Sequence, residues 1–114
     1  MSDAFQDREN TFEKQFAHDE DLRFKAVARR NKAVARRNRA MALWVAETKG
    51  LSATDAEKYA SEFVGAQIGK SEDDVAAAFK ADLERGNVDL SDHRLRKKMD
   101  EEMVAAIASV RAGK

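Results

Sequence analysis

The chain has no cysteine, no proline and only five glycines among its 114 residues. Without cysteine, disulfide scaffolds, thiolate zinc sites, thiol nucleophiles and CxxC redox pairs are excluded. Because proline and glycine interrupt helices most often, their scarcity permits long helices. No apolar run approaches the ~20 residues that a membrane-spanning helix needs, and no signal peptide opens the sequence. We therefore expect a small, soluble, cytoplasmic helical protein with no direct membrane insertion.

Charge is balanced over the whole chain but is segregated along it. Residues 1–21 carry a net charge of −5, and residues 22–39 carry +8 without a single acid. Residues 40–92 then carry −6, and residues 93–114 carry +3. Such segregation indicates either packing between oppositely charged segments or a charged partner. Composition alone does not choose between these two explanations.

Serines and glycines divide the second half of the chain into helical segments. Three serines can cap the N-termini of apolar-periodic segments, and three glycines stand where the preceding segments end. Apolar residues recur at spacings of three and four, and no segment alternates as a strand does. The residues concerned are Ser52, Ser71 and Ser91, and Gly50, Gly69 and Gly86. The sequence thus predicts an all-α chain with helices near residues 19–49, 53–68, 72–85 and 92–111.

The first of these segments contains an internal repeat. Residues 25–31, KAVARRN, recur identically as residues 32–38. Seven residues fall about 20° short of two full helical turns and add about 10 Å of length. A helix can therefore absorb the duplication without rotating its two ends out of phase. A seam of residues at spacings of three and four runs through both copies: Phe24, Val27, Asn31, Val34, Asn38, Met41 and Val45.

The first 18 residues differ in kind from the rest of the chain. Phe5, Phe12 and Phe16 share one helical face among charged residues, and apart from Met1 no larger aliphatic residue precedes Leu22. Such a segment can fold onto another protein, or its aromatic rings can dock on the core of its own chain. Because it lacks aliphatic residues for burial, we expect residues 1–18 to be mobile in the isolated protein.

Residues that carry out catalysis or bind metals are sparse. His18 and His93 have no second ligand at a helical spacing, so no metal site is expected. The capping serines lack a nucleophile motif, and no two glycines are close enough to form a phosphate-binding loop. We therefore expect neither an enzyme nor a resident cofactor.

Nucleic-acid binding is the alternative suggested by the basic segment. Eight bases within residues 22–39 would attract a phosphate backbone. However, Arg29 and Arg30 point 100° apart on a helix. Within the basic segment, Phe24 is the only aromatic residue on which a base could stack. The neighbouring acidic segments could instead neutralise the basic helix within the fold. We expect no nucleic-acid partner, and we retain the basic-helix hypothesis as the competing one.

Two segments carry a more specific signal. Residues 5–32, FQDRENTFEKQFAHDEDLRFKAVARRNK, resemble the N-terminal signature of the zeta-subunit family, the small inhibitors of bacterial F-type ATP synthases. Residues 90–101, LSDHRLRKKMDE, resemble that family's second signature. Between them, ALWVAE followed by a glycine and an acidic cap is similar to the family's middle segment. The resemblance covers nearly the whole chain.

The resemblance implies an all-α four-helix bundle over residues 19–114, preceded by a mobile inhibitory segment over residues 1–18. In the family this segment inserts between a catalytic beta subunit and an alpha subunit, near the gamma subunit, and blocks rotation in the direction of ATP hydrolysis. The implied location is cytoplasmic, at the inner membrane through the ATP synthase. The matching positions are Phe5, Asp7, Arg8, Glu9, Phe12, Glu13 and Phe16.

This chain also departs from the family pattern. The family has one ARRNK, so the duplicated heptad should lengthen the first helix by about two turns. Ala40, Met41 and Ala42 stand where family members usually have leucines and a glycine. Basic residues near Trp44 or Tyr59 could also give the bundle a weak affinity for ATP or ADP, although no phosphate-binding loop is present. The competing interpretation is that Trp44 simply packs on the core.

Overall fold

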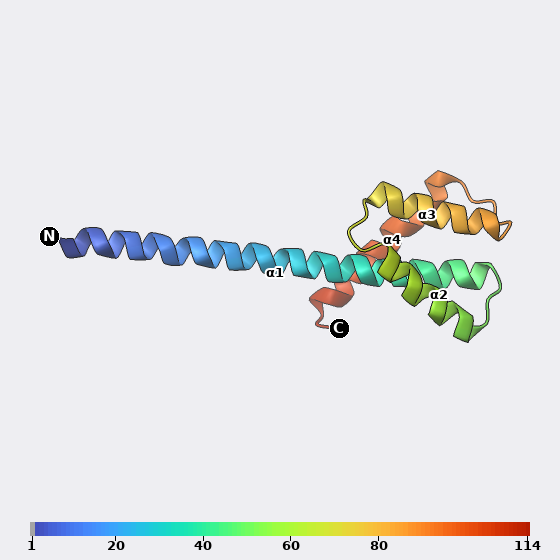
Figure 1. Ribbon diagram of the computed structural model, residues 1–114, viewed down its shortest axis with the longest axis horizontal. Coiled ribbons are helices and arrows are strands. Elements are labelled where there is room, and N and C mark those ends of the chain that lie inside the picture. Colours follow the sequence, from blue (N-terminus) through green and yellow to red (C-terminus); the bar gives the residue numbers. More distant parts are fainter. Residues whose placement is uncertain (1) are drawn as a thin grey trace. The chain divides into compact units, whose positions relative to one another are not determined.

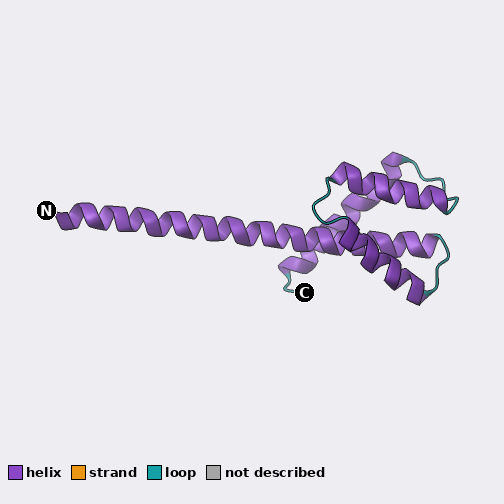
Figure 2. Cartoon of the chain, in the orientation of Figure 1, coloured by secondary structure: helices purple, strands orange, loops and turns teal. Residues whose placement is uncertain are grey.

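The computed structural model describes the backbone of residues 2–114 and the side chains of Thr11 and of residues 13–114 (Figure 1). Four helices make up its regular structure, and no strand occurs in these residues. The helices are α1 (Ser2–Thr48), α2 (Ala53–Ala66), α3 (Glu72–Arg85) and α4 (Asp92–Arg111). Short loops join them, as Figure 2 shows. The predicted all-α class with four helices is confirmed.

The chain divides into two compact units, which we call the N-terminal unit (residues 1–31) and the bundle unit (residues 32–114). The N-terminal unit consists of helix within α1. The bundle unit contains the remainder of α1 together with α2, α3 and α4. The boundary between the units falls between the two copies of the heptad.

Helix α1 begins at Ser2, well before the start near Asp19 that the sequence indicated. Residues 2–18 contain neither glycine nor proline, so no residue in them interrupts helical hydrogen bonding. The C-terminal end at Thr48 lies one residue from the predicted end. The mobility of residues 1–18, and with it their separation from residues 19–114, stays a prediction.

All three predicted serine caps are present. The hydroxyl oxygens of Ser52, Ser71 and Ser91 each accept a hydrogen bond from the backbone N–H three residues later, at 3.1–3.2 Å. Each serine has an extended backbone conformation, as the residue before a helix requires. These caps fix where α2, α3 and α4 begin.

The helix C-termini depend on left-handed residues. Gly50 and Gly69 have φ angles of +79° and +77°, as expected for residues that follow a helix end. After α3, however, Asn87 adopts this conformation with φ of +58°, and Gly86 does not. Asparagine tolerates the left-handed region better than most residues, so the turn forms one position later than a glycine rule suggests. Helix α2 ends at Ala66, which leaves Ile68 exposed in the following turn.

The core of the bundle unit draws on all four helices. The rings of Phe63 on α2 and Phe79 on α3 stack with centroids 4.1 Å apart. Offset aromatic stacking at this separation adds stabilisation to the burial of the two rings. The fully or almost fully buried apolar residues around this pair are Met41, Ala42, Val45, Ala60, Val75, Ala76, Leu83, Leu95 and Met99. The predicted stripes on α2, α3 and the first half of α4 therefore form the core.

Candidate interaction surfaces

The seven positions implied by the resemblance all lie on the helical backbone of α1. The side chains of Phe5, Asp7, Arg8, Glu9 and Phe12 lie outside the described residues. The structure does describe Glu13 and Phe16, and both are exposed. These two residues are three positions apart, so their side chains lie near one another on the helix surface.

The N-terminal unit exposes large apolar side chains. Phe24 is 74% exposed and Val27 is 57% exposed, although both belong to the seam that becomes buried further along α1. Phe16 and Leu22 are exposed as well. A helix with several exposed large apolar residues is typical of a segment that binds another protein.

The two copies of the heptad have different surroundings. In the first copy Ala26, Arg30 and Asn31 are exposed. In the second copy their counterparts Ala33, Arg37 and Asn38 are at most 3% exposed. Because the two sequences are identical, only contacts with the rest of the bundle unit can cause this difference. The sequence contained no signal for which copy would be buried.

Arg37 connects α1 to the beginning of α3. Both of its terminal nitrogens donate to the carboxylate of Glu72, one of them at 2.9 Å, and the guanidinium also donates to Asn38 Oδ1 at 2.8 and 3.0 Å. Paired donors matched to a carboxylate are a strong form of hydrogen bonding. Glu72 lies in the first turn of α3, where a negative charge also interacts favourably with the helix dipole. The buried guanidinium charge is therefore compensated.

Two other arginines of α1 make contacts within the bundle unit. Arg36 donates to the hydroxyl of Ser109 at 2.6 Å and to the carbonyl oxygen of Lys114. Arg39 pairs with Glu57 of α2 at 2.5 Å. The basic segment is thus partly neutralised within the fold, as one of the two sequence-based explanations proposed. No feature of the sequence predicted that Arg37 is buried.

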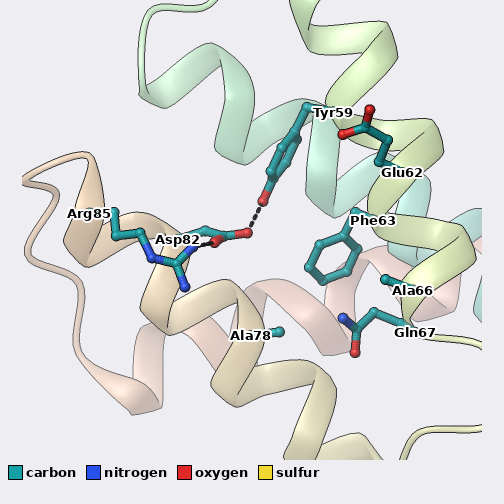
Figure 3. A pocket seen from close by; sticks show the side chains of 8 residues that line it. All are labelled: Tyr59, Glu62, Phe63, Ala66, Gln67, Ala78, Asp82 and Arg85. Atoms are coloured by element: carbon teal, nitrogen blue, oxygen red, sulfur yellow. Dashed lines mark hydrogen bonds and ion pairs between the residues drawn. The ribbon is translucent and has the colours of Figure 1, made fainter.

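A pocket of about 330 Å³ lies between α2 and α3 (Figure 3). The Tyr59 hydroxyl donates to Asp82 Oδ2 at 2.5 Å, and Arg85 pairs with the same carboxylate. Figure 3 shows Asp82 between these two side chains, with Phe63 on the opposite side of the pocket. Burial, and then the bond to Asp82, raise the pKa of Tyr59 well above its ordinary value of 10.0. Tyr59 therefore stays a neutral donor at physiological pH.

The single cation of this pocket is already paired and Glu62 adds a further negative charge, so the pocket has little to offer a phosphate. Arg85, its only basic lining residue, is engaged by Asp82. Lys49 instead lies over the Tyr59 ring, with its Nζ 5.4 Å from the centroid. Trp44 is partly buried against the core, and Lys98 Nζ lies 5.6 Å from its ring centroid. Both contacts have cation–π distances that stabilise the fold without any ligand. Weak nucleotide binding near these rings stays a prediction.

The remaining candidates from the sequence are on the surface. His18 and His93 are exposed. Among the described residues, no group of three or more histidines and carboxylates is placed to hold a metal ion. The search for membrane spans found no helix in the described residues with both the length and the apolar character to cross a bilayer.

These features define the class: a small all-α protein with a four-helix bundle and a helical N-terminal unit that exposes apolar residues. A family model described as ATPase inhibitor subunit zeta matches residues 1–109. The chain belongs to this family of ATPase inhibitor subunits. No curated protein and no solved structure matches the chain.

Proposed function

We propose that this protein inhibits ATP hydrolysis by an F-type ATP synthase, and that residues 1–18 insert at a catalytic alpha/beta interface near the gamma subunit. The observation that carries the proposal is the family match, which begins at residue 1 and so includes this segment. In this proposal Phe5, Phe12 and Phe16 are apolar anchors. Arg8 and Glu9 make polar contacts in the cleft.

The physical basis is the burial of aromatic residues on binding. Phe16 is 56% exposed in the isolated chain, so a cleft that covers its ring removes apolar surface from water. An amphipathic helix that lays its apolar face into a groove is a common mode of recognition. The inserted segment would block rotation in the hydrolysis direction only while it occupies the interface.

The same proposal has consequences for chemistry and location. An inhibitor of this kind acts by occupying a site, so it needs neither catalytic residues nor a resident cofactor. Any affinity for ATP or ADP would be weak and secondary. The protein would reach the inner membrane through its contacts with the alpha, beta and gamma subunits of the synthase.

The test is ATP hydrolysis by an isolated catalytic head of a cognate synthase, measured with the full-length chain and with a variant lacking residues 1–18. We expect full inhibition by the first protein and none by the second. Thermal unfolding should show the same midpoint for both, because the core residues all lie in the bundle unit. Equal inhibition by the two proteins would contradict the proposal.

Two substitutions test whether inhibition depends on a phenylalanine of residues 1–18 or on any phenylalanine of α1. Phe12→Ala should weaken inhibition by about 2 kcal/mol, or roughly 30-fold, as loss of a buried interface anchor does. The matched control is Phe24→Ala, which removes an exposed phenylalanine outside the segment. If both variants weaken inhibition equally, the anchors are not confined to residues 1–18.

The basic-helix hypothesis makes the opposite forecast. If the chain bound nucleic acid, charge reversal at Arg29 and Arg30 would abolish binding, and removal of residues 1–18 would have little effect. Both arginines are exposed, so their reversal should not disturb the fold. A filter-binding titration with the same set of variants distinguishes the two functions.

A further inference from the structure

The described part of the N-terminal unit carries a regular row of side chains on one face of α1. Its members follow one another at alternating spacings of three and four, which is the pattern of interface positions in a coiled coil. All of them are exposed, so nothing in the described chain covers this face. This N-terminal row consists of Glu13, Phe16, Glu20, Arg23, Val27 and Arg30.

The order of side-chain types in the N-terminal row is complementary to itself when it is reversed. Towards the C-terminus the row runs acid, apolar, acid, and then base, apolar, base. A second row laid against it in the opposite direction therefore brings each acid to a base and each apolar residue to an apolar one. The matched residues are Glu13 with Arg30, Phe16 with Val27, and Glu20 with Arg23.

This matching determines which orientation of two identical helices is favourable. In an antiparallel pair with a two-fold axis every contact occurs twice, because each copy presents the same surface to the other. A parallel pair would instead place Glu20 against Glu20 and Arg23 against Arg23, and like charges repel. The N-terminal row therefore fits a second copy of itself in the antiparallel orientation alone.

The charges of the N-terminal row are available for such contacts. None of its four charged residues takes part in the ion pairs found between described residues. The ion pair that this unit does form joins Lys25 to Asp21, and both of these residues lie outside the row. An incoming copy would thus break no ion pair that the described residues form.

We propose that the N-terminal row binds a second copy of this chain, antiparallel to the first, about a two-fold axis between residues 21 and 22. Phe16 of each copy packs on Val27 of the other, and this contact removes apolar surface from water. The ion pairs fix the register more than they add affinity, since both charges lose hydration. The row is only about 25 Å long, so the interface is small and the dimer is weak.

The duplicated heptad supplies half of the N-terminal row. Val27 and Arg30 belong to its first copy, and their counterparts Val34 and Arg37 belong to the bundle unit. Val34 is partly buried there, and Arg37 is fully buried. A chain with a single heptad would have these two residues committed to the bundle. The extra heptad therefore provides a second set that is free to bind another copy.

The dimer would also affect the inhibition proposed above, and this consequence alone rests on that proposed function. Phe16 is an anchor of the inhibitory segment, so a chain whose Phe16 packs on another copy could not insert it into the synthase. The experiments below contain no synthase. Failure of the dimer and failure of inhibition can therefore be told apart.

The test is sedimentation equilibrium of the full-length chain at neutral pH, up to a chain concentration of about 2 mM. We expect a monomer–dimer equilibrium with a dissociation constant below about 1 mM at low salt. Raising the salt concentration to about 0.5 M should increase this constant at least fivefold, because the ion pairs are exposed to screening. A chain that stays monomeric, or a dissociation constant that salt leaves unchanged or lowers, would overturn the proposal.

Two charge reversals test the matched pair at the centre of the row. Glu20→Arg and Arg23→Glu each place like charges opposite one another twice, so each variant alone should have a dissociation constant at least tenfold higher. In an equimolar mixture each substituted residue faces an opposite charge on the other variant. The mixture should therefore associate within threefold of the wild-type constant. A mixture that associates no better than the separate variants would overturn the proposal.

The chain provides two matched controls. Asp21→Arg makes the same charge change as Glu20→Arg at the next residue, outside the row, and should leave the dissociation constant within threefold. Equal weakening by these two variants would show that net charge controls association, and would overturn the proposal. Deletion of residues 25–31 leaves only the heptad that the bundle buries, so this variant should stay monomeric. Dimerisation of the deletion variant with the wild-type constant would equally overturn the proposal.

Discussion

The two copies of the heptad KAVARRN have the same residues and lie in the same helix, but they have different environments. Residues 25–31 belong to the N-terminal unit, where Ala26, Arg30 and Asn31 are exposed. Residues 32–38 belong to the bundle unit, where the corresponding residues are buried. Helix propensity is identical for both, so it cannot account for the difference. Contacts with the rest of the bundle unit decide whether a residue of the repeat is buried or exposed.

The largest effect should follow from charge reversal in the two copies. Arg37→Glu places a second carboxylate beside Glu72 in a buried site, so we expect the free energy of unfolding to fall by about 3 kcal/mol or more. Arg30→Glu changes an exposed residue of the same type and should alter it by less than about 0.5 kcal/mol. Urea denaturation of both variants measures the difference. Similar losses in the two proteins would mean that both copies pack equally well.

The contacts of Arg37 explain why its reversal should be so costly. The structure shows Arg37 buried and bonded to Glu72, so its reversal should affect the stability of the fold. Arg37→Met should cost less than Arg37→Glu, because Glu72 is 53% exposed at its side chain and water can solvate it.

The next effect concerns volume instead of charge. Ala33→Leu adds three carbons at a position that is 2% exposed, so overpacking should lower the free energy of unfolding by about 1–3 kcal/mol. Ala26→Leu makes the same change on the surface, where leucine is an adequate helix former, and should be nearly neutral. Thermal unfolding midpoints distinguish the two. An Ala33→Leu variant as stable as the wild type would indicate spare room around residue 33.

A smaller effect is expected at Tyr59, in a part of the bundle unit that the repeat does not touch. Tyr59→Phe removes the hydrogen bond to Asp82, but Arg85 still pairs with that carboxylate. The free energy of unfolding should therefore fall by only about 1 kcal/mol at neutral pH. Urea titrations at pH 7 measure it. A decrease in the free energy of unfolding as large as that expected for Arg37→Glu would contradict this ranking.

The same variant has a defined pH dependence. The folded protein raises the pKa of Tyr59 above its ordinary value of 10.0, so the folded state holds this proton more tightly than the unfolded state. The contribution of the protonated Tyr59 side chain to stability is fully present below pH 10, and it is lost as pH rises further through the folded-state pKa. As the pH rises above 10, the free energy of unfolding of the wild type should therefore fall more than that of Tyr59→Phe. Parallel pH profiles of the two proteins would contradict the raised pKa.

The smallest effect should follow from the largest change in length. Deletion of residues 25–31 and deletion of residues 32–38 give the same shortened sequence. In that protein the single remaining heptad supplies the alanine, arginine and asparagine that the bundle buries. We expect the free energy of unfolding to change by less than about 0.5 kcal/mol, because surface residues alone are lost. A large loss, seen by urea denaturation, would show that the first copy also supports the bundle.

Much of the fold could be predicted because its signals are local. Ser52, Ser71 and Ser91 mark helix starts through bonds to backbone three residues away, so the sequence holds the whole interaction. The core positions of α3 follow from spacing alone. The turn at Asn87 was missed because the glycine beside it is the stronger general signal for a left-handed residue.

The surfaces were harder to predict because they depend on contacts between distant residues. Arg37 meets Glu72 across 35 positions, and nothing near Arg37 distinguishes it from Arg30. A surface pocket lined by Lys32, Arg36 and Arg39 forms only because α2 lies beside this part of α1. The exposed residues Phe16, Phe24 and Val27 are typical of a protein-binding segment, and the partner that such a segment would bind stays a proposal.

The repeat also gives the molecule an internal reference for hydrogen exchange. The unprotected exchange rate of an amide depends on its neighbours in sequence, and residues 26–30 and 33–37 have identical neighbours on both sides. The ratio of the rates of two equivalent amides therefore cancels pH, temperature and intrinsic chemistry. What remains is the protection that packing in the bundle unit adds to helical hydrogen bonding. One exchange experiment on this protein can thus separate the stability of a helix from the stability of a bundle.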